Sequence, residues 1–303
     1  MDNWWRLKVP ASSANLGPGF DALGLALSPY LYCRFRRSSS LVIRVTGRDA
    51  DLISTGEDNL IWQTALTVAE HTSEAMPPVE MEINNEIPLG KGLGSSAAAL
   101  TAGVILADVL LGLRWKNHRI LDEAARIEGH PDNVAACVLG SIVASAIDSS
   151  GMTRAVRLEL PPSFEVAVVV PDFPLPTHQA RAALPDSYSK ADAVFNVQRS
   201  AWLIAALATG TISAFPAALE DRMHQPYRQR LVPGLEEILK LRAPGLLGCC
   251  LSGAGPSILV FFEKGHEGVV RHVQQIFEAH GHAAEILDSQ VDRQGFLLEE
   301  EVA

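Results

Sequence analysis

The chain has 303 residues, which is long for one compact domain, since domains usually contain about 100–200 residues. With 48% hydrophobic and 20% charged residues, it has enough apolar material for a core and too little polarity for a disordered segment. Its formal net charge of −10 argues against the broad basic surface that nonspecific nucleic-acid binding requires, so we expect no nucleic-acid partner.

Targeting and membrane signals are not expected from the sequence. The first residues, MDNWWRLKVP, turn polar too soon for a secretory signal. Residues 92–107 are uncharged for only 16 residues, which falls short of the roughly 18–20 that a spanning helix needs. The four cysteines form no CxxC pair, and we interpret them as buried thiols in a reducing compartment. We therefore expect a cytoplasmic protein without a membrane partner.

The first half of the chain predicts a sheet covered by helices. Short β-rich runs separated by Gly, Pro and Ser clusters lie at residues 7–9, 30–35, 41–45 and 81–83. Helical patterns follow at residues 59–75, 95–111 and 120–127. The runs SIVASAI and VRLEL then predict paired strands around an Asp-Ser-Ser-Gly turn. We expect these elements to form a first domain over residues 1–160.

The second half repeats the mixture of strands and helices. From Phe164 it gives the apolar strand FEVAVVV, a Pro-rich loop, helices near residues 191–207 and 233–241, the strand-turn-strand stretch GLLGCCLSGAGPSILVFFE and a helix at residues 267–280. This alternation predicts an α/β or α+β architecture for the chain, with a second domain over residues 161–303.

The segment from residue 88 to residue 98 has three glycines within five residues, followed by a serine pair. The glycines let the backbone turn with exposed amides, and a helix that starts at Ser95 has first N–H groups without internal partners. Aligned amides and the helix dipole can hold a polyphosphate, while Lys91 adds a mobile positive charge. A glycine-rich connector with a serine N-cap is the alternative. The candidate nucleotide-binding residues are Pro88, Leu89, Gly90, Lys91, Gly92, Leu93, Gly94, Ser95, Ser96, Ala97 and Ala98.

Two better-known phosphate loops do not fit this segment. A Walker loop requires G-x-x-x-x-G-K-[ST], but Gly92 follows Lys91, and Asn85 occupies the position of the first glycine. A dinucleotide loop, G-x-G-x-x-G starting at Gly90, requires a glycine where Ser95 stands. The segment therefore predicts a phosphate loop of another kind.

Three further motifs accompany this loop: PASSANLGPGFDALGLAL from residue 10, EGHPDNVAACVLG from residue 128 and LSGAGPS from residue 251. Together with PLGKGLGSSAAAL, and in this order, they resemble the GHMP kinase superfamily. The first motif resembles, in particular, the homoserine kinase family within it. The four motifs span essentially the whole chain, which leaves little room for chance.

The resemblance implies a two-domain α+β fold, in which an N-terminal α/β domain with a left-handed βαβ crossover meets a C-terminal ferredoxin-like domain at the active site. The general rule for crossovers predicts the right hand, so the left hand follows from the resemblance alone. The implied activity is ATP-dependent phosphorylation of the side-chain hydroxyl of L-homoserine to O-phospho-L-homoserine, in threonine biosynthesis. A homodimer is implied as well.

The resemblance also implies ATP and Mg²⁺ as cofactors. The metal ligands would be Glu128 and a serine of the 95–96 pair, with Ser96 favoured, and hard oxygen ligands of this kind suit Mg²⁺. Asn59 matches a family position near the adenine, although a helix-capping asparagine is an equal alternative.

An amino acid with a terminal hydroxyl needs a carboxylate for its ammonium group and a guanidinium for its carboxylate. Asp21 matches the first role with Asn15 beside it, and Arg181 and Arg228 match the second. The expected substrate-binding residues are Asn15, Asp21, Asn133, Thr177, Arg181, Arg228 and Gly253.

The expected catalytic residues are His130, Asn133 and Lys91. Asn133 would orient the reacting hydroxyl, whereas His130 is as often a structural histidine as a catalyst. Asp132 could act as a general base, like an aspartate in related kinases that act on mevalonate, or could simply cap the next helix. A loose transition state demands little early proton removal, so positioning by Asn133 is sufficient.

Two other functions stay open at this point: another small-molecule GHMP kinase of the mevalonate type, and a non-catalytic binding protein with the same fold. ADP release over a panel of hydroxylated acids, with and without an α-amino group, would separate them.

Overall fold

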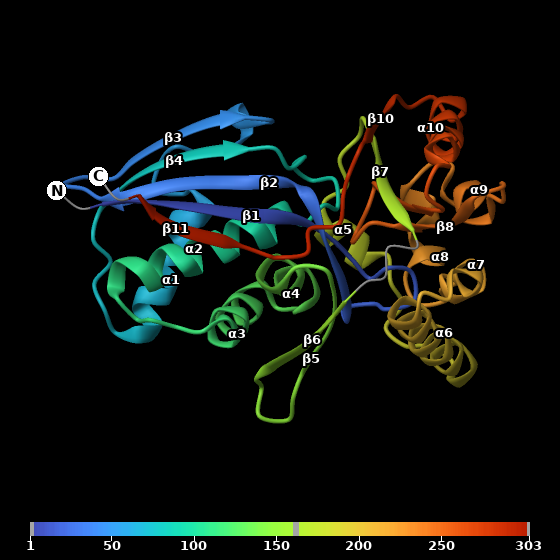
Figure 1. Cartoon of the computed structure of the whole chain (residues 1–303), viewed down its shortest axis with the longest axis horizontal. Helices are drawn as coiled ribbons and strands as arrows, with labels where there is room; N and C mark the ends of the chain where they lie inside the picture. The colour runs from blue at the N-terminus through green and yellow to red at the C-terminus, as the bar shows by residue number, and fades with distance from the viewer. Residues whose placement is uncertain (1–2, 160–163, 302–303) are drawn as a thin grey trace.

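The computed structural model describes residues 3–159 and 164–301, which form two domains side by side (Figure 1). The first domain is a mixed sheet with helices on one face, and the second is an antiparallel sheet with helices of its own. Within the described part of the chain, each helix is too short or too polar to cross a membrane.

The described residues contribute seven strands to the first sheet: β1 (Trp4–Ala14), β2 (Leu23–Arg37), β3 (Val42–Gly47), β4 (Val79–Asn85), β5 (Ile142–Ile147), β6 (Thr153–Leu158) and β11 (Leu297–Glu301). Five of them follow the order β11-β1-β2-β4-β3, and β5 pairs with the start of β2 and with β6. The β5–β6 hairpin projects from the body of the domain (Figure 1). β3 and β4 run parallel, and the other pairs are antiparallel.

The helices of the first domain lie under this sheet: α1 (Leu60–Thr72), α2 (Ser95–Leu111), α3 (Asn117–Glu128) and α4 (Asp132–Leu139), with the short 3-10 helix η1 (Ala50–Leu52) before α1. α2 is apolar almost all round because it packs against α1, α3, α4 and β1. At Gly103 of α2 the helices α1 and α2 approach closely, since a Cβ there would lie 2.6 Å from the Ile61 carbonyl oxygen. This packing fixes the N-terminus of α2, where the glycine-rich segment ends.

The second domain has the strands β7 (Glu165–Pro171), β8 (Leu246–Leu251), β9 (Ile258–Phe262) and β10 (Ala284–Leu287). Their order is β10-β7-β9-β8, which is the antiparallel pairing of a ferredoxin-like β-α-β-β-α-β unit. The helices are α5 (Thr177–Ala182), α6 (Lys190–Thr209), α7 (Phe215–Ala218), α8 (Gln225–Arg228), α9 (Leu235–Lys240) and α10 (Val270–Ala279), with the 3-10 helices η2 (Ile212–Ala214), η3 (Gln229–Leu231) and η4 (Glu267–Val269).

One apolar cluster runs through both domains. It includes α2 and the helix-covered face of the first sheet, and it continues into the second domain through Val168, Phe215 and Phe261. A second cluster fills the space between the second sheet, α9 and α10. Because the domains share a core, side chains that meet between them are held in a defined arrangement.

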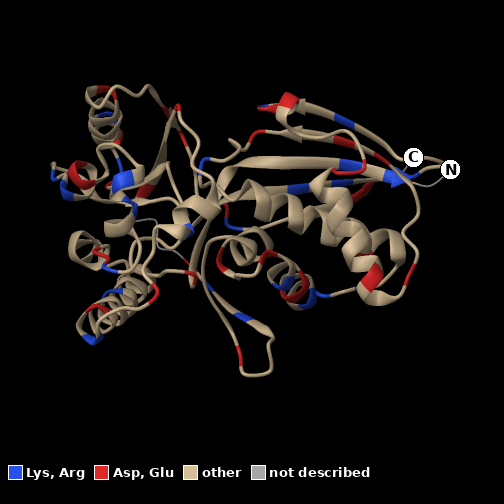
Figure 2. Ribbon diagram, turned by 180° about the vertical axis from the view of Figure 1, so that it is seen from behind, with Lys and Arg blue, Asp and Glu red and all other residues tan. Residues whose placement is uncertain are grey.

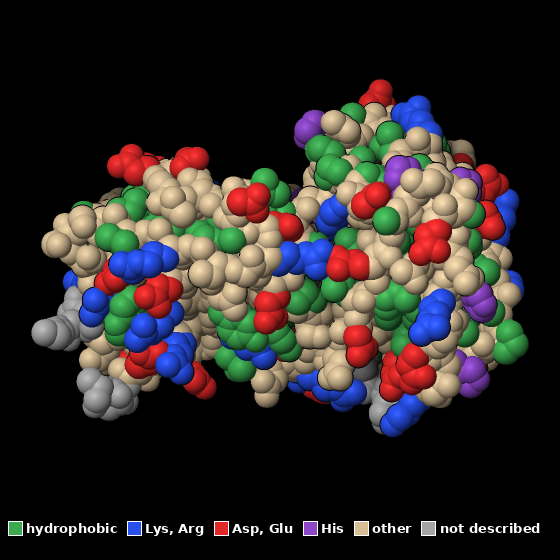
Figure 3. Space-filling model, turned by 90° about the horizontal axis from the view of Figure 1, so that it is seen from above, with side chains coloured by type: hydrophobic (Ala, Val, Ile, Leu, Met, Phe, Trp, Pro, Cys, Tyr) green, Lys and Arg blue, Asp and Glu red, His purple; other side chains and the backbone are tan. Residues whose placement is uncertain are grey.

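Positions occupied by basic and by acidic residues are interspersed over the ribbon of the two domains seen from behind (Figure 2). On β2, Arg34 and Arg36 form ion pairs with Glu301 and Glu80, respectively. In the view from above, basic and acidic side chains again lie next to one another, between small apolar groups (Figure 3). Positive charge is therefore balanced locally in these views.

The predicted elements of the first half are present, and the predicted helix at residues 95–111 coincides with α2. The first β-rich run, predicted at residues 7–9, is longer in the structure, because β1 continues to Ala14. Ser12 and Ser13 are fully buried in this strand, and their hydroxyls bind Asn133 and Ser252, respectively. Small polar residues suit a strand end that is covered on both sides.

The predicted boundary between residues 160 and 161 lies outside the described residues. The last strand, β11, pairs with β1 from Trp4 opposite Glu301 to Lys8 opposite Leu297, so both ends of the described chain lie together (Figure 1). The end of the expected unit 161–303 thus belongs to the first sheet. The hand of the β3-α1-β4 crossover stays a prediction.

Candidate active site

The glycine-rich segment is a loop whose carbonyl groups accept hydrogen bonds from several other segments. The carbonyls of Gly90, Lys91, Gly92 and Leu93 each accept a hydrogen bond from another part of the protein, namely Leu175 N, Ser257 N, the Ser252 hydroxyl and Ser12 N. Gly90, Gly92 and Gly94 have φ values of 66°, 77° and 67°, which glycine adopts without strain. The loop then enters α2, whose first amides lack helical partners.

Two cavities meet at the N-terminus of α2, because both are lined by Ser95 and Ser96. The first lies between the domains and is lined by charged and polar side chains from both. The second is mainly apolar and includes Leu52 and Leu60, which are 71% and 43% exposed. A polar cavity and an apolar cavity on either side of a helix N-terminus can hold two different molecules that meet at a phosphate.

A carboxylate and two guanidinium groups line the first cavity. Arg181, on α5, donates two hydrogen bonds of 3.1 and 2.8 Å to the two Asp21 oxygens. Arg228, at the end of α8, is 2% exposed, and its Nε and Nη1 donate to the carbonyls of Ala180 and Gly253. Burial, together with the nearby Arg181, lowers the pKa of Arg228 to about 10, so it stays charged at neutral pH.

Phe20 lies close to both cations. Its ring centre is 5.7 Å from the Arg181 guanidinium and 5.6 Å from that of Arg228. Its other neighbour is His224, whose ring stacks at 5.4 Å with an angle of 28°. The aromatic face gives the cations a partner that leaves their N–H groups available for hydrogen bonds.

Asn15 and Gly253 join the two domains at the floor of the cavity. The Asn15 amide donates to the Gly253 carbonyl at 2.9 Å and accepts from the Asp21 backbone N–H at 3.0 Å. Asn15 adopts φ of 70°, which asparagine tolerates better than most residues. Both functional groups of the Asn15 side chain are thus engaged in holding the loop that carries Asp21.

Ser96 and Glu128 also line this cavity and approach each other. Ser96 is in the first turn of α2 and Glu128 is the last residue of α3, and the Ser96 hydroxyl donates to Glu128 Oε2 at 3.4 Å. Burial raises the pKa of Glu128, which means that its negative charge lacks full compensation within the protein.

His130, Asp132 and Asn133 follow Glu128 at the entrance to α4. His130 Nδ1 donates to Asp132 at 2.7 Å, and Nε2 lies 3.8 Å from Glu128 Oε1. Burial opposes protonation of His130, but the two carboxylates outweigh it and raise the pKa of the imidazole. Asn133 accepts from the Ser12 hydroxyl at 2.9 Å, which leaves its amide N–H groups for the cavity.

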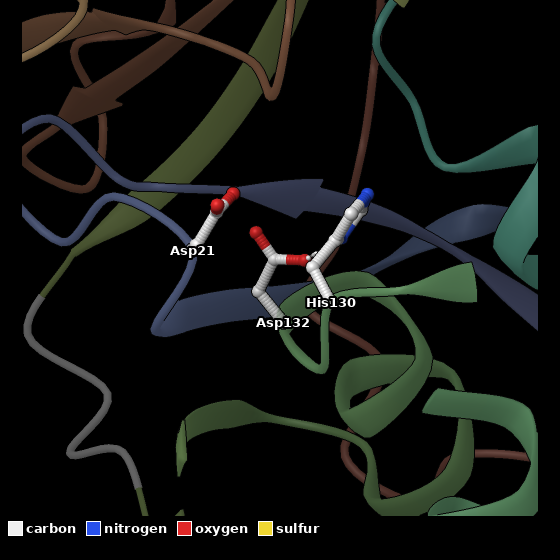
Figure 4. Close-up of side chains that lie close together, drawn as sticks. All are labelled: Asp21, His130 and Asp132. Atoms are coloured by element: carbon white, nitrogen blue, oxygen red, sulfur yellow. Dashed lines mark hydrogen bonds and ion pairs between the residues drawn. The ribbon is translucent and has the colours of Figure 1, made fainter. Parts of the chain in front are cut away.

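Asp132 lies between Asp21 and His130 (Figure 4), and ligand atoms of the three residues are within 4.8 Å of one another. Asp132 also accepts from the Asn133 backbone N–H at 2.7 Å. Because Arg181 occupies both oxygens of Asp21 and Asp132 binds His130, this cluster is a hydrogen-bonded network, and the Ser96–Glu128 pair suits a divalent cation better.

Known proteins are similar to this chain over nearly its whole length. The family model described as the GHMP kinases N terminal domain matches residues 59–141, and that of the GHMP kinases C terminal matches residues 203–279. The homoserine kinase of Solibacter usitatus (strain Ellin6076) is 71% identical over 98% of each chain. The chain belongs to the homoserine kinase family. It is therefore a kinase with the two-domain GHMP fold.

Further members of the homoserine kinase family support this placement. The homoserine kinase of Deinococcus radiodurans is 40% identical over 97% of this chain and 96% of that protein. The crystal structure of homoserine kinase from Cytophaga hutchinsonii covers 99% of this chain and 98% of its own, at 28% identity and a TM-score of 0.85.

The structure brings most of the expected site residues of this homoserine kinase family member to one cavity. Those at its lining are Asn15, Asp21, Gly90, Gly92, Gly94, Ser95, Ser96, Glu128, His130, Asn133, Thr177, Arg181, Arg228 and Gly253. Leu89 and Asn59 line the apolar cavity instead. Leu93, Ala97 and Ala98 are buried in the core beneath the loop. Pro88 lines neither cavity.

The side chain of Lys91 lies outside both cavities. Its ammonium group donates to the Pro171 carbonyl at 2.8 Å, at the end of β7, and its side chain lines neither cavity. Burial lowers the pKa of this amine. In this arrangement Lys91 connects the loop to the second domain rather than pointing at the helix N-terminus.

Asn59 caps α1. Its side-chain oxygen accepts from the backbone N–H groups of Ile61 and Trp62 at 3.0 and 3.4 Å, and its amide donates to the Ser54 carbonyl at 2.7 Å. Asn59 is therefore a helix cap that also lines the apolar cavity, and its place near the adenine stays a prediction.

Sequence analysis did not select Phe20 and His224. Phe20 stands in the first motif, next to Asp21, so an aromatic residue in a run of small ones was an available signal. His224 stands four residues before Arg228, a spacing that brings side chains together on a helix.

Proposed function

We propose that this chain transfers the γ-phosphoryl group of ATP to the side-chain hydroxyl of L-homoserine, giving O-phospho-L-homoserine for threonine biosynthesis. The observation that carries the proposal is the cavity in which Asp21, Arg181 and Arg228 face the N-terminus of α2. A zwitterionic amino acid needs one carboxylate partner and at least one guanidinium, and a phosphoryl donor needs the helix N-terminus.

ATP would lie across the two cavities. The adenine suits the apolar cavity, where Leu52 and Leu60 are exposed and Asn59 offers polar atoms at the wall. The polyphosphate suits the part of this loop after Leu89, because the carbonyls of residues 90–93 bind other segments and, among the described residues, the amides of residues 90–97 donate no hydrogen bond and could face an anion. The support for a direct role of Lys91 is weakest, since its ammonium group binds Pro171.

Mg²⁺ would be held by Ser96 and Glu128. Their oxygen atoms are hard ligands 3.4 Å apart, and burial raises the pKa of Glu128, so a divalent cation would offset the cost of its charge. When bound, the cation would neutralise negative charge that develops on the phosphates during transfer. Protonated His130, 3.8 Å from Glu128, would add positive charge on the same side.

L-Homoserine would break the direct ion pair between Asp21 and Arg181 and would lie between these two side chains. Its ammonium group would bind Asp21, and its carboxylate would bind Arg181 and the Nη2 edge of Arg228. The hydrogen bonds of Arg228 within the described residues use Nε and Nη1, which leaves Nη2 for this purpose. Thr177 and Gly253 line the same cavity and would contact the part of the substrate between its ammonium and carboxylate groups and its hydroxyl.

Asn133 would orient the reacting hydroxyl towards the phosphate loop. Ser12 fixes the Asn133 side-chain oxygen, so the amide N–H groups are directed to the cavity and can donate to the hydroxyl. Asp132 is 1% exposed and is engaged with His130 and the Asn133 backbone, which supports a positioning role for it in place of a general base. Alignment and charge stabilisation then account for most of the catalysis.

The proposal also includes an oligomeric state and a cellular location. A homodimer rests on the resemblance alone, and light scattering on the purified protein tests it. A cytoplasmic location is supported by the use of ATP and by four buried thiols, at Cys33, Cys137, Cys249 and Cys250, and cell fractionation tests it.

ADP release over a panel of hydroxylated acids tests the function. L-Homoserine should be turned over far faster than mevalonate, which lacks an α-amino group, and than the homoserine analogue that lacks the carboxylate. Equal rates with mevalonate would favour another kinase activity, and no ADP release with any acceptor would favour a non-catalytic binding protein.

A further inference from the structure

His224 is a buried polar side chain next to the proposed substrate clamp, and it is 0% exposed. It precedes α8 and stands four residues before Arg228. Its ring lies between the β1–β2 loop and Arg228, so it contacts two of the segments that form the cavity. Burial of the polar ring nitrogens of a histidine costs free energy that an apolar residue of the same size would not, so these nitrogens should have specific partners here.

The hydrogen bonds of His224 define its protonation state. Nε2 lies 2.7 Å from the Gly17 carbonyl oxygen, which can only accept, so Nε2 carries the proton. Nδ1 lies 3.1 Å from Arg228 Nη1, which can only donate, so Nδ1 must be an unprotonated acceptor. Burial lowers the pKa of His224, in agreement with a neutral ring.

The charges around the ring agree with this assignment. Burial and the positive charge of Arg228 oppose protonation of the ring, whereas the negative charges of Asp221 and Asp21 favour it. Asp221 Oδ2 is 3.5 Å from Nε2, but it already accepts from the backbone N–H groups of His224 and Gln225 at 3.0 and 2.6 Å. Asp221 therefore holds the backbone that carries the ring.

Arg228 has three acceptors from three different segments. Nε binds the carbonyl of Ala180 on α5, and Nη1 is shared between the carbonyl of Gly253 and His224 Nδ1. His224 is the one side chain among these acceptors. These contacts fix the plane of the guanidinium and leave the Nη2 edge towards the cavity that Arg228 lines.

We infer that His224 is a positioning residue for substrate binding: its neutral imidazole fixes the guanidinium of Arg228 and the ring of Phe20, so that Arg228 presents Nη2 to the carboxylate of the amino-acid substrate. The inference rests on the proposed function for the identity of that substrate. Its effect should appear in the use of the amino acid and not in the use of ATP, because the phosphate loop lies outside the contacts of His224.

Two substitutions separate the two hydrogen bonds of the ring. In His224→Gln, the side-chain amide can still donate to Gly17 from the position of Nε2, but the acceptor for Arg228 is lost. In His224→Asn, the side-chain oxygen can replace Nδ1 as the acceptor, but the donor to Gly17 is lost. Tyr188→Phe is the matched control, since it removes a 2.8 Å hydrogen bond to the neighbouring Met223 carbonyl without touching Arg228's acceptors.

Steady-state kinetics with L-homoserine and ATP should separate these variants. We expect His224→Gln to raise the KM for homoserine about 10-fold or more, the effect of one hydrogen bond to a charged group, with the KM for ATP nearly unchanged. His224→Asn should retain most of the homoserine affinity while its Tm falls, and Tyr188→Phe should behave like the wild type. Equal KM values for homoserine in both His224 variants and the wild type, or equal increases for both substrates, would overturn the inference.

NMR of the wild-type protein with isotope-labelled histidine tests the same inference without a variant. The ring of His224 should be neutral with its proton on Nε2 at neutral pH, and an imidazolium or an Nδ1–H tautomer would contradict the role. Absence of turnover of homoserine by the wild type is a separate outcome, which would overturn the proposed function and this inference with it.

Discussion

Replacement of Arg181 by Met is the cleanest perturbation of the proposed substrate clamp. Arg181 is on the short helix α5, its side chain is 38% exposed, and its hydrogen bonds in the structure go to Asp21. Met keeps much of the aliphatic length but removes the guanidinium. The substitution therefore changes the charge that faces the cavity and leaves the core in place.

The expected loss follows from the type of contact. A hydrogen bond to a charged group contributes about 1.5–3 kcal/mol, so loss of the carboxylate contact should lower kcat/KM for homoserine by roughly one to two powers of ten. Stability should change much less, because an ion pair that is more than one third exposed contributes at most about 1 kcal/mol. Arg181→Lys should restore activity only in part, since it keeps the charge and loses the planar fork.

Arg228 is a less specific probe of the same clamp. It is 2% exposed, and its removal would take a donor away from the Ala180 carbonyl and from Nδ1 of His224, and would leave the Gly253 carbonyl with the Asn15 amide. Arg228→Met should therefore lower both homoserine affinity and Tm, whereas Arg181→Met should lower the first alone.

The assay compares L-homoserine with its analogue that lacks the carboxylate, as substrates of the wild type and of Arg181→Met. The wild type should prefer homoserine strongly, and the variant should lose most of that preference while its KM for ATP stays nearly unchanged. If Arg181→Met discriminated between the two compounds as well as the wild type does, the carboxylate would have to bind elsewhere and the reasoning would fail.

Other sites give further expectations. Glu128→Gln should lower turnover more than homoserine binding in Mg²⁺ titrations, and Ser96→Ala should have a smaller effect in the same direction. Burial raises the pKa of Glu128, so the ionised carboxylate destabilises the fold at pH values above the ordinary glutamate pKa. Glu128→Gln should therefore raise the Tm at neutral pH in metal-free buffer and should no longer raise it in acid. An equal gain in Tm at both pH values would contradict this. Asn59→Ala should lower the free energy of unfolding, measured with denaturant, by about 1 kcal/mol and should raise the KM for ATP. A loss of stability with an unchanged KM for ATP would mean that Asn59 serves only as a helix cap. Lys91→Met should weaken ATP binding only modestly if Lys91 stays on Pro171, and a loss of 100-fold or more, on the order of a lost direct charge contact, would show that it reaches the phosphates.

Local sequence chemistry predicted the conformation of the glycine-rich loop and the start of the helix that follows it. Three glycines before a serine-led apolar helix predict a loop with free amides, and α2 starts at Ser95 with Gly94 as its N-cap. The direction of Lys91 could not be predicted in the same way, because its partner, the Pro171 carbonyl, is 80 residues away in the chain. A long side chain takes its position from tertiary contacts that its neighbours in sequence do not encode.

The substrate side depended on contacts between distant segments. Asp21 and Arg181 are 160 residues apart, and their direct pairing follows from the way in which α5 packs over the β1–β2 loop. Sequence analysis assigned them separate roles and could not foresee that each is the other's partner. The same holds for β11, a short polar run whose strand character comes from pairing with β1.

A crystal structure of the protein with L-homoserine and a non-hydrolysable ATP analogue tests the central claim most directly. The account predicts the substrate ammonium group on Asp21, the carboxylate on Arg181 and Arg228, and the hydroxyl beside Asn133 with the terminal phosphate at the N-terminus of α2. A homoserine molecule bound outside this cavity, or one whose hydroxyl points away from the phosphate loop, would contradict it.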